Sequence, residues 1–410
     1  MRIPLVLSIL LVLFSILIDI YILFDIRRKY IGKKKKMMEY MYSISSVLLW
    51  AFVIIALCLP RKNENDSILP VMWMLFSFLT IYIPKFIYCI FSIFGNILSY
   101  FIKRRIKYIS WIGIGLGVIV FISMWWGIIH TRHTLEINKL DIVSSKLPES
   151  FNGYKIVQFS DMHLGTWGND TTFISKMVDS INNQQPDVIL FTGDFVNRKG
   201  EELKPFKKIL GRLKASDGVY AVYGNHDYGG YVDWTTQEAY NNNLSELHKD
   251  IAEMGWQMLN NQTAFLKNKQ DSIVLIGVHN WGEPPFNQLG DLGKSYPESN
   301  DKLKGLNDGM FKILLTHNPE HWIKVATKIS NIDLSLSGHT HAMQIMLKLG
   351  DFKWSPSKFR YKDWGGLYNT VASDGTPMNL YVNIGVGEVG FPARIGAAKP
   401  EITVFTLHNK

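Results

Sequence analysis

Cysteine is nearly absent from this chain of 410 residues, which contains only Cys58 and Cys89. Both lie in apolar stretches of the first quarter of the sequence. The rest of the chain can therefore form neither a disulfide framework nor a cysteine-type zinc site. Two such cysteines do not decide the redox compartment. Internal repeats and low-complexity tracts are lacking as well.

Acidic residues are outnumbered by basic ones, with 35 Asp and Glu against 44 Lys and Arg, for a formal net charge of +9. Such a charge is compatible with nucleic-acid binding, but many of the basic residues lie between apolar runs near the N-terminus. This distribution indicates a topology signal beside anionic lipid head groups, so we expect membrane lipids and no nucleic acid as partners. The length predicts one large domain plus a further region.

The first third of the chain contains four apolar segments, Ile3–Phe24, Ile44–Leu59, Val71–Leu98 and Trp111–Ile129. As helices, the first and third segments are easily long enough to cross a bilayer, the fourth is long enough, and the second is short. A cleaved signal peptide does not account for the first segment, because its apolar run is too long and no cleavage-site signature follows it. We predict a multi-pass cell-membrane protein with about four transmembrane helices, an all-α region over residues 1–130. Should Ile44–Leu59 fail to cross, the topology after it is inverted.

Lysine and arginine are concentrated in the first and third of the loops between these segments. The first loop has Arg27–Lys29 and Lys33–Lys36, the third has Lys103–Arg105 and Lys107, and the second has only Arg61 and Lys62. Because short cytoplasmic loops have the excess of positive charge, we expect the C-terminal domain on the extracytoplasmic face.

Two ionisable residues lie inside the apolar segments. Lys85 follows Pro84 near the middle of the third segment, and an intramembrane lysine is a candidate for a functional site. The alternative that we favour is a kinked or partly re-entrant segment whose Lys85 extends to an interface. Asp19, toward the end of the first segment, is expected to reach the interface in the same way.

Polar side chains follow five apolar strands in the C-terminal part of the chain. Val219–Tyr223 is followed by Gly224, Asn225, His226 and Asp227. The other four are Tyr154–Phe159 before Asp161 and His163, Val188–Thr192 before Asp194, Lys312–Thr316 before His317, and Asp333–Ser337 before His339 and His341. The carboxyl ends of strands are the usual place for sites in α/β domains. Three oxygen donors and four imidazoles suit two divalent metal ions such as Mn, Fe or Zn, which predicts a two-metal hydrolase site.

In this order, Asp-x-His, Gly-Asp, Gly-Asn-His-Asp, a lone His and Gly-His-x-His resemble the calcineurin-like metallophosphoesterase superfamily. The resemblance extends from about Tyr154 to Leu407 and implies a β-sandwich with helices on both outer faces. It thus implies an α/β metallophosphoesterase domain over residues 153–410, after a linker at residues 131–152. It also implies one ion held by Asp161, His163 and His341, another held by Asn225, His317 and His339, and a bridging Asp194. His226 would be the general acid or stabilise phosphoryl charge, and Asp227 would orient it.

The tail from Asn383 to Ile402 resembles a membrane-associated branch that includes phosphodiesterases and UDP-diacylglucosamine pyrophosphatases. Two positions depart from the family pattern. Asn197 stands where the family often has an aspartate, which puts an outer hydrogen bond in doubt. Ala342 and Met343 stand where it often has two glycines, which can alter the floor of a substrate pocket. Neither departure removes a metal ligand.

Two further residues are candidates for substrate contact. Arg394 suits a bidentate phosphate contact, and a structural salt bridge is the equal alternative. His279 follows the strand Val274–Val278 and is equally consistent with a hydrogen-bonded loop histidine. The loop Trp281–Gly309 is long enough for a lid. The aromatic-basic segment Asp351–Thr376 is expected either on lipid head groups or in the core.

The periodicity predicts amphipathic helices at Phe173–Asn183, Leu203–Leu213 and Leu244–Met254, with Tyr228–Asn243 at the rim of a pocket. We predict a membrane-anchored two-metal phosphoesterase that hydrolyses a phosphodiester or pyrophosphate bond, in a lipid-linked or cell-envelope substrate. The alternatives are a cytoplasm-facing nucleotide-sugar lipid pyrophosphatase or a phosphomonoesterase. A non-catalytic sensor is disfavoured because all seven ligands are present, and a transporter because few ionisable residues lie inside the apolar segments.

Overall fold

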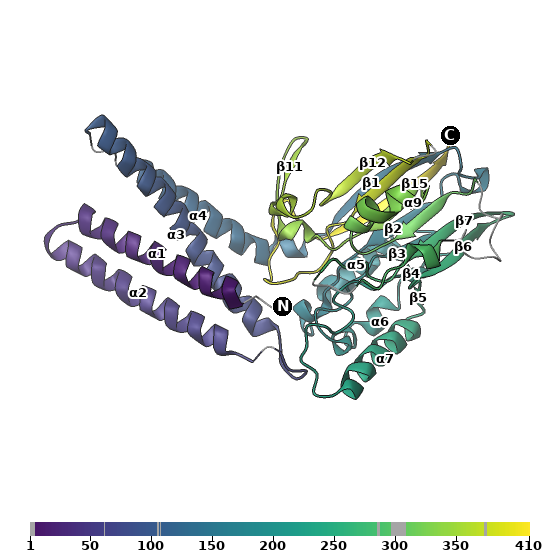
Figure 1. Cartoon of the computed structure of the whole chain (residues 1–410), viewed down its shortest axis with the longest axis horizontal. Coiled ribbons are helices and arrows are strands. Elements are labelled where there is room, and N and C mark those ends of the chain that lie inside the picture. Colours follow the sequence, from purple (N-terminus) through teal and green to yellow (C-terminus); the bar gives the residue numbers. More distant parts are fainter. Residues whose placement is uncertain are drawn as a thin grey trace. The chain divides into compact units, whose positions relative to one another are not determined.

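The computed structural model describes residues 5–60, 62–104, 106, 108–284, 288–296, 309–372 and 375–410. It divides the chain into two compact units (Figure 1). The first, called here the membrane unit, consists mainly of residues up to Ile129. The second, called the domain, comprises residues 62–64, 130–389 and 394–410. Arg61, Arg105, Lys107 and residues 285–287 and 297–308 of the predicted lid loop lie outside the described residues.

The membrane unit contains four long helices, α1 (Leu5–Lys29), α2 (Gly32–Cys58), α3 (Leu69–Ile102) and α4 (Tyr108–Ile129). Each is long and apolar enough to cross a membrane, so the prediction of four helices is confirmed. The helix α2 is longer than the short segment predicted for it. Its first turns contain Lys33–Lys36, which were expected in a loop.

The helix α3 continues through Pro84, so the re-entrant alternative is wrong. Two glycines of α4 pack closely against it. A Cβ atom at Gly113 would lie 2.7 Å from Phe91 Cβ, and one at Gly117 would lie 3.2 Å from the carbonyl oxygen of Pro84. Small residues at such contacts let two membrane helices approach backbone to backbone.

Lys85 and Asp19 form an ion pair between α3 and α1. Lys85 Nζ lies 2.8 Å from Asp19 Oδ1, and both side chains are largely buried. Tyr42, Trp50 and Tyr82 also donate hydrogen bonds to the Asp19 carboxylate. Both charges are thus paired between neighbouring helices, and their position at an interface stays a prediction.

The domain is a sandwich of two six-stranded mixed sheets (Figure 1). The first sheet has the order β1 (Glu136–Ser144), β15 (Glu401–Asn409), β2 (Lys155–Phe159), β3 (Val188–Phe191), β4 (Val219–Ala221) and β5 (Gln257–Met258). The second has the order β12 (Gly366–Val371), β13 (Pro377–Val382), β9 (Leu334–Ser337), β8 (Lys312–Leu315), β7 (Asp271–Gly277) and β6 (Gln262–Asn268). A smaller sheet has the order β11 (Phe352–Trp354), β10 (Ile345–Leu349) and β14 (Ile395–Gly396).

Alternating side chains of the strands build three apolar layers. Ile156 of β2 packs with Leu275 and Leu315 in the core between the sheets, whereas its neighbour Val157 faces the opposite side. That outer layer is covered by α5 (Thr172–Asn182), α6 (Lys207–Leu210) and α7 (Gln237–Glu253). The outer face of the second sheet packs against α8 (Leu292–Ser295) and the π-helical turn η6 (Trp322–Ala326), which continues into α9 (Thr327–Ile329). The β-sandwich with helices on both faces is thus confirmed.

Two predicted helices differ from the structure. The helix α7 begins at Gln237 rather than Leu244, because Thr236 Oγ1 caps it by accepting a 3.0 Å hydrogen bond from the Ala239 N–H. The predicted helix Leu203–Leu213 is divided at Pro205, which has no N–H to continue a helix. The remaining short turns are η1 (Thr131–His133), η2 (Glu149–Phe151), η3 (Leu164–Trp167), η4 (Gly200–Leu203), η7 (His341–Gln344) and η8 (Pro356–Phe359).

Candidate metal centre

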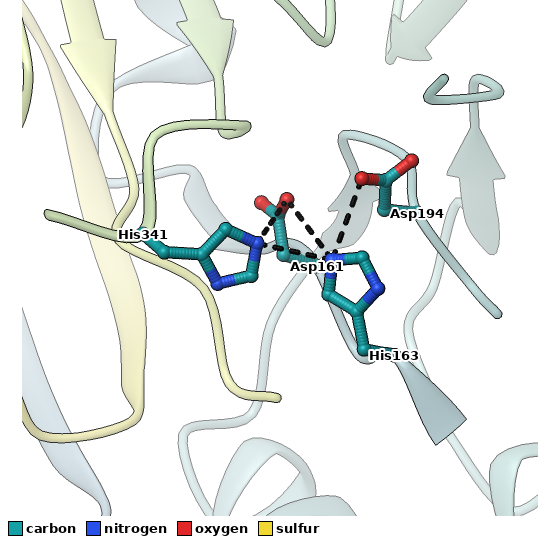
Figure 2. Close-up of side chains that lie close together, drawn as sticks. All are labelled: Asp161, His163, Asp194 and His341. Atoms are coloured by element: carbon teal, nitrogen blue, oxygen red, sulfur yellow. Dashed lines mark hydrogen bonds and ion pairs between the residues drawn. The ribbon is translucent and has the colours of Figure 1, made fainter. Parts of the chain in front are cut away.

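Four of the predicted ligands meet at the carboxyl ends of β2, β3 and β9. Figure 2 shows the side chains of Asp161, His163, Asp194 and His341 directed toward one another. His341 Nε2 lies 3.1 Å from Asp161 Oδ1 and 3.0 Å from His163 Nε2. His163 Nε2 lies 3.4 Å from Asp194 Oδ2. All four side chains are buried, so their donor atoms surround one enclosed point.

The other three predicted ligands also meet beside Asp194. His317 Nε2 lies 3.2 Å from Asp194 Oδ2, 3.2 Å from Asn225 Oδ1 and 3.2 Å from His339 Nδ1. Asp194 therefore belongs to both groups of donors. The structure brings together all seven side chains that the sequence singled out, with one carboxylate between the two groups.

The backbone at this site is strained. Five of the seven residues have a left-handed φ, namely Asp161, His163, Asp194, His339 and His341, with values from 42° to 74°. Non-glycine residues adopt such angles at a cost, and they cluster at functional sites. Glycines allow the close approach of the loops that this requires. A Cβ atom at Gly224 would lie 2.2 Å from Asp194 Oδ1, and one at Gly338 would lie 2.2 Å from Asp161 Oδ2.

Burial and neighbouring charges set the protonation states of these groups. Burial alone would raise the pKa of Asp194, but the adjacent His317 and His226 rings outweigh it and hold that pKa well below its usual range. Burial lowers the pKa of His339 to about 3, assisted by the neighbouring His317. Burial also lowers the pKa of His163. For His317 the carboxylates of Asp194 and Asp161 outweigh burial and raise the pKa to about 9.

This donor set fits divalent cations. Ionised carboxylates and neutral imidazoles are the forms in which Asp and His bind metals. His163 Nε2 and His341 Nε2 lie 3.0 Å apart with carboxylates around them, and a shared divalent cation can be bound by all of these donors at once. Oxygen and imidazole donors without thiolates are compatible with Mn, Fe or Zn.

Three ligands are oriented by hydrogen bonds from their other atoms. His317 Nδ1 lies 2.8 Å from the carbonyl oxygen of Thr192, and Asn225 Nδ2 donates to the Tyr231 hydroxyl at 2.8 Å. The Tyr361 hydroxyl lies 3.0 Å from His339 Nε2. Such partners fix the ring or amide so that its other donor atom faces the remaining predicted ligands. Sequence reasoning missed the roles of Tyr231 and Tyr361, because nothing in the spacing of either residue signals them.

His226 lies beside the centre without belonging to either group of ligands. Its Nδ1 lies 2.6 Å from the carbonyl oxygen of Asn197, which can only accept, so Nδ1 has the proton and the neutral ring has its lone pair at Nε2. The ring stacks on Tyr231, with centroids 4.2 Å apart. Burial lowers the pKa of His226. The residue is thus held in one orientation, as a proton-transfer group requires.

Asp227 does not orient the His226 ring, and this predicted role is wrong. Its carboxylate accepts backbone N–H groups from Gly224 at 2.8 Å, Asp194 at 2.9 Å and Phe195 at 2.8 Å. Asp227 therefore joins the loop that contains Asp194 to the loop that contains Asn225. The carbonyl oxygen of Asn197 holds the ring instead.

Arg394 is not available for a phosphate contact, so that prediction is also wrong. The side chain is fully buried, and burial lowers the pKa of its guanidinium to about 10. Nη2 donates to the carbonyl oxygens of Ile384 at 3.0 Å and Gly387 at 2.6 Å, and Nη1 donates to that of Ala398 at 3.3 Å. Arg394 ties the C-terminal loops together through carbonyl groups rather than through the salt bridge considered as its alternative.

The position of His279 supports its alternative as a loop histidine. Its Nδ1 lies 2.9 Å from the Tyr228 hydroxyl, and its ring also lies near that of Tyr223. Burial lowers the pKa of His279, which favours the neutral ring. A contact between His279 and substrate remains a prediction.

The two departures from the family pattern have local explanations. Asn197 Oδ1 accepts from the Thr166 N–H at 2.9 Å, and Nδ2 donates to the carbonyl oxygen of Glu388 at 3.1 Å, so both ends of the amide are used. Ala342 and Met343 have φ values of 50° and 45°. Glycine adopts these angles freely, which explains why glycine suits this turn and why this chain is strained there.

Comparison with known families agrees with this geometry. Residues 1–132 match the family described as "Probable Calcineurin-like phosphoesterase, transmembrane domain", and residues 154–343 match "Calcineurin-like phosphoesterase". An uncharacterized metallophosphoesterase of Bacillus subtilis, YkuE, is 33% identical over 68% of this chain and 87% of its own length. The chain belongs to the calcineurin-like metallophosphoesterases.

Two further relatives are named for a transmembrane region or for an activity. A transmembrane protein with metallophosphoesterase domain from Danio rerio is 30% identical over 71% of this chain, which spans 61% of that relative's length. The UDP-2,3-diacylglucosamine pyrophosphatase LpxG of Chlamydia muridarum is 29% identical over 52% of this chain and 71% of its own length. This member of the family is thus a membrane-associated, metal-dependent phosphoric ester hydrolase.

Proposed function

We propose that this protein is a two-metal phosphoesterase anchored in the membrane, which hydrolyses a phosphodiester or pyrophosphate bond. Asp161, His163 and His341 would hold one ion, Asn225, His317 and His339 the other, and Asp194 both. The position of Asp194 is the observation that supports this, since its Oδ2 lies within 3.4 Å of His163 Nε2 and 3.2 Å of His317 Nε2. Two ions that share a carboxylate are spaced for in-line displacement at phosphorus.

Two such ions, when bound, supply an activated water as nucleophile and charge compensation for the phosphoryl oxygens. As the imidazolium, with protons on both ring nitrogens, His226 would transfer the Nε2 proton to the leaving oxygen, a role worth roughly 10²–10⁴-fold in rate. The carbonyl oxygen of Asn197 keeps Nε2 as the atom that faces substrate. Asp227 would act indirectly, by fixing the backbone around Asp194.

The substrate is proposed to be lipid-linked. The Chlamydia relative is named as a pyrophosphatase of UDP-2,3-diacylglucosamine, and this supports a lipid-linked substrate. The basic ends of α1 and α2 together with Lys103 and Arg104 after α3 favour an extracytoplasmic domain. Lipid-linked phosphates and cell-envelope polymers would be available there. A nucleotide-sugar lipid pyrophosphatase is the second candidate, which the same relative favours if the domain faces the cytoplasm.

A reporter that is active only outside the cytoplasm distinguishes these two candidates. Fused after Lys410, it should give a strong signal if the domain is extracytoplasmic. A second fusion near Asn65, between α2 and α3, is expected on the same side and serves as the control. Absence of signal at both fusions, with both proteins shown to be present, would favour the cytoplasmic pyrophosphatase.

The activity itself is tested with bis-p-nitrophenyl phosphate and the purified full-length protein. Hydrolysis should stop after chelation and return when Mn²⁺ is added. His408→Asn is a matched control variant, because His408 pairs with Asp141 on β15 and β1 rather than with the metal ligands. A full-length, folded protein that hydrolyses neither diesters nor pyrophosphates with Mn²⁺, Fe²⁺ or Zn²⁺ would contradict the proposal.

A further inference from the structure

The hairpin of β10 and β11 exposes large apolar side chains. Leu347 is 57% exposed, Leu349 82% and Phe352 63%, and Phe359 in the following turn η8 is 85% exposed. The register pairs Leu347 with Trp354 and Leu349 with Phe352, so these four side chains share one face of the hairpin. A contiguous apolar surface of this kind marks an interaction site rather than an ordinary water-exposed strand.

The opposite face of the same hairpin is basic. The register places Lys348 directly opposite Lys353, and like charges so placed repel each other. In the part of the chain that the structure describes, no carboxylate forms an ion pair with either lysine. An anionic partner would relieve this repulsion.

The basic face borders a cavity of about 360 Å³ that Lys139 and Lys399 also line. Two carboxylates are present as well. Glu136 pairs with Lys399 at 3.5 Å, while Glu401 accepts from Tyr381 and has its pKa raised to about 7 by burial. Both carboxylates thus have their own partners, and the lysines give the cavity an excess of positive charge. A phosphate head group fits this charge and size.

The cavity also adjoins the strand by which the chain enters the domain. Glu136, Asn138 and Lys139 of β1 line it, and β1 begins only seven residues after α4 ends at Ile129. Because α4 is long and apolar enough to cross a membrane, this short connection tethers the start of β1 to the end of a membrane helix. An amphipathic hairpin with one apolar and one basic face suits the boundary between head groups and acyl chains.

The hairpin is joined to the metal centre at both ends. It begins four residues after His341, and Ser355, directly after β11, donates a hydrogen bond to the carbonyl oxygen of Ala342. Tyr361, beyond η8, contacts His339. A hairpin held on lipid would therefore hold the edge of the metal centre near the bilayer surface.

We propose that the β10–β11 hairpin and the lysine-lined cavity form a binding site for an anionic phospholipid of the bilayer. The apolar face enters the acyl layer, and Lys348 and Lys353 contact the head-group phosphate. The site would present the metal centre with amphiphilic phosphoesters that stay in the membrane. Only this last step rests on the proposed function.

Spin labels on the full-length protein in nanodiscs test the docking without any measurement of hydrolysis. Cys58→Ser and Cys89→Ala remove the two native cysteines. A label at Leu349→Cys or Phe352→Cys should then collide more often with oxygen than with a water-soluble nickel chelate in phosphatidylglycerol discs. A label at Ile329→Cys, an apolar side chain of α9 that is 61% exposed, should show the opposite preference. Equal access of nickel to all three labels would overturn the proposal.

Charge reversal tests the head-group contact. Lys348→Glu combined with Lys353→Glu should shift the label at Leu349→Cys toward water by about tenfold or more in the ratio of the two collision rates, because each lysine contributes to binding at an anionic surface. Lys208→Glu with Lys267→Glu, at two exposed lysines elsewhere in the domain, should not. The proposed phosphate contact would be contradicted if the label's collision ratio were unchanged by Lys348→Glu with Lys353→Glu. It would also be contradicted if the label lay equally deep in phosphatidylcholine and phosphatidylglycerol discs.

The link to substrate is tested separately. The Lys348→Glu and Lys353→Glu variant should lose turnover of a fluorescent phosphodiester lipid in vesicles and retain turnover of bis-p-nitrophenyl phosphate. Equal loss of both would assign the hairpin a merely structural role. If the wild-type protein hydrolyses neither probe while the labels still lie in the bilayer, the proposed function fails and the lipid site stands.

Discussion

The chain buries a carboxylate in each of its two units, and the two are satisfied in different ways. Asp19 in the membrane unit accepts hydrogen bonds from Tyr42, Trp50 and Tyr82 and forms an ion pair with Lys85. Asp194 in the domain instead faces two imidazoles and lies in one cluster with a second carboxylate. A buried carboxylate that is surrounded by hydrogen-bond donors and a counter-charge requires no further partner. Asp194 shares its site with imidazoles and with the carboxylate of Asp161, and a divalent cation fits this set of donors. The contrast separates a structural ion pair from a metal centre.

The largest effect is expected at the shared carboxylate. Asp194→Asn keeps the shape but removes the charge between the two groups of donors. Hydrolysis of bis-p-nitrophenyl phosphate should fall by more than the roughly 10–100-fold that loss of an outer hydrogen-bond partner costs. Thermal unfolding should stay near that of the wild type. A variant with unaltered kcat would mean that Asp194 is not a metal ligand.

Substitution of His226 tests whether a residue beside the metal-binding side chains contributes to catalysis without contributing to metal binding. His226→Ala should lower kcat by roughly 10²–10⁴-fold for substrates with poor leaving groups, because the proton donor is lost. The loss should be much smaller for p-nitrophenolate esters, and metal content should stay at the wild-type level. Equal losses for good and poor leaving groups would leave the acid role without support.

In the membrane unit, the same reasoning predicts a change in stability rather than in chemistry. Asp19→Ala leaves Lys85 buried without its counter-charge and should lower the free energy of unfolding by about 3–5 kcal/mol. Lys85→Met in the same protein should restore part of it, because no unpaired charge then remains, although Tyr42, Trp50 and Tyr82 still lack their acceptor. Unfolding in detergent, followed by circular dichroism, measures both. Failure of the second substitution to rescue the first would show that the pair is not the stabilising unit.

The smallest effect is expected at Asn197, where the family often has an aspartate. Asn197→Asp removes the donor to the Glu388 carbonyl and should destabilise the domain by about 1–3 kcal/mol. It should leave kcat near the wild-type value, because His226 contacts the main-chain carbonyl of this residue rather than its side chain. A large loss of kcat with unchanged stability would contradict this separation.

The sequence predicted the ligands better than it predicted their partners. Asp161, His317 and the other ligands follow strands that end at one edge of the sandwich, so spacing alone brings them together. The partners depend on side-chain directions that no periodicity encodes. Asp227 turns to backbone N–H groups rather than to the adjacent His226.

Local sequence patterns also could not predict contacts between residues that are far apart in the sequence. Lys85 and Asp19 are separated by 66 positions, and Tyr361 reaches His339 from a segment that the sequence indicated only as aromatic and basic. Arg394 was misjudged for a related reason. A guanidinium suits phosphate and carbonyl oxygens alike, and only burial distinguishes the two.

Asp194 is proposed to join two metal ions. Electron paramagnetic resonance of the full-length protein loaded with Mn²⁺ tests this, because two ions joined by one carboxylate couple magnetically. We expect two Mn²⁺ per chain and a coupled signal in the wild type, and the loss of that coupling in Asp194→Asn. One ion per chain in the wild type, or a coupled pair that persists in Asp194→Asn, would contradict it.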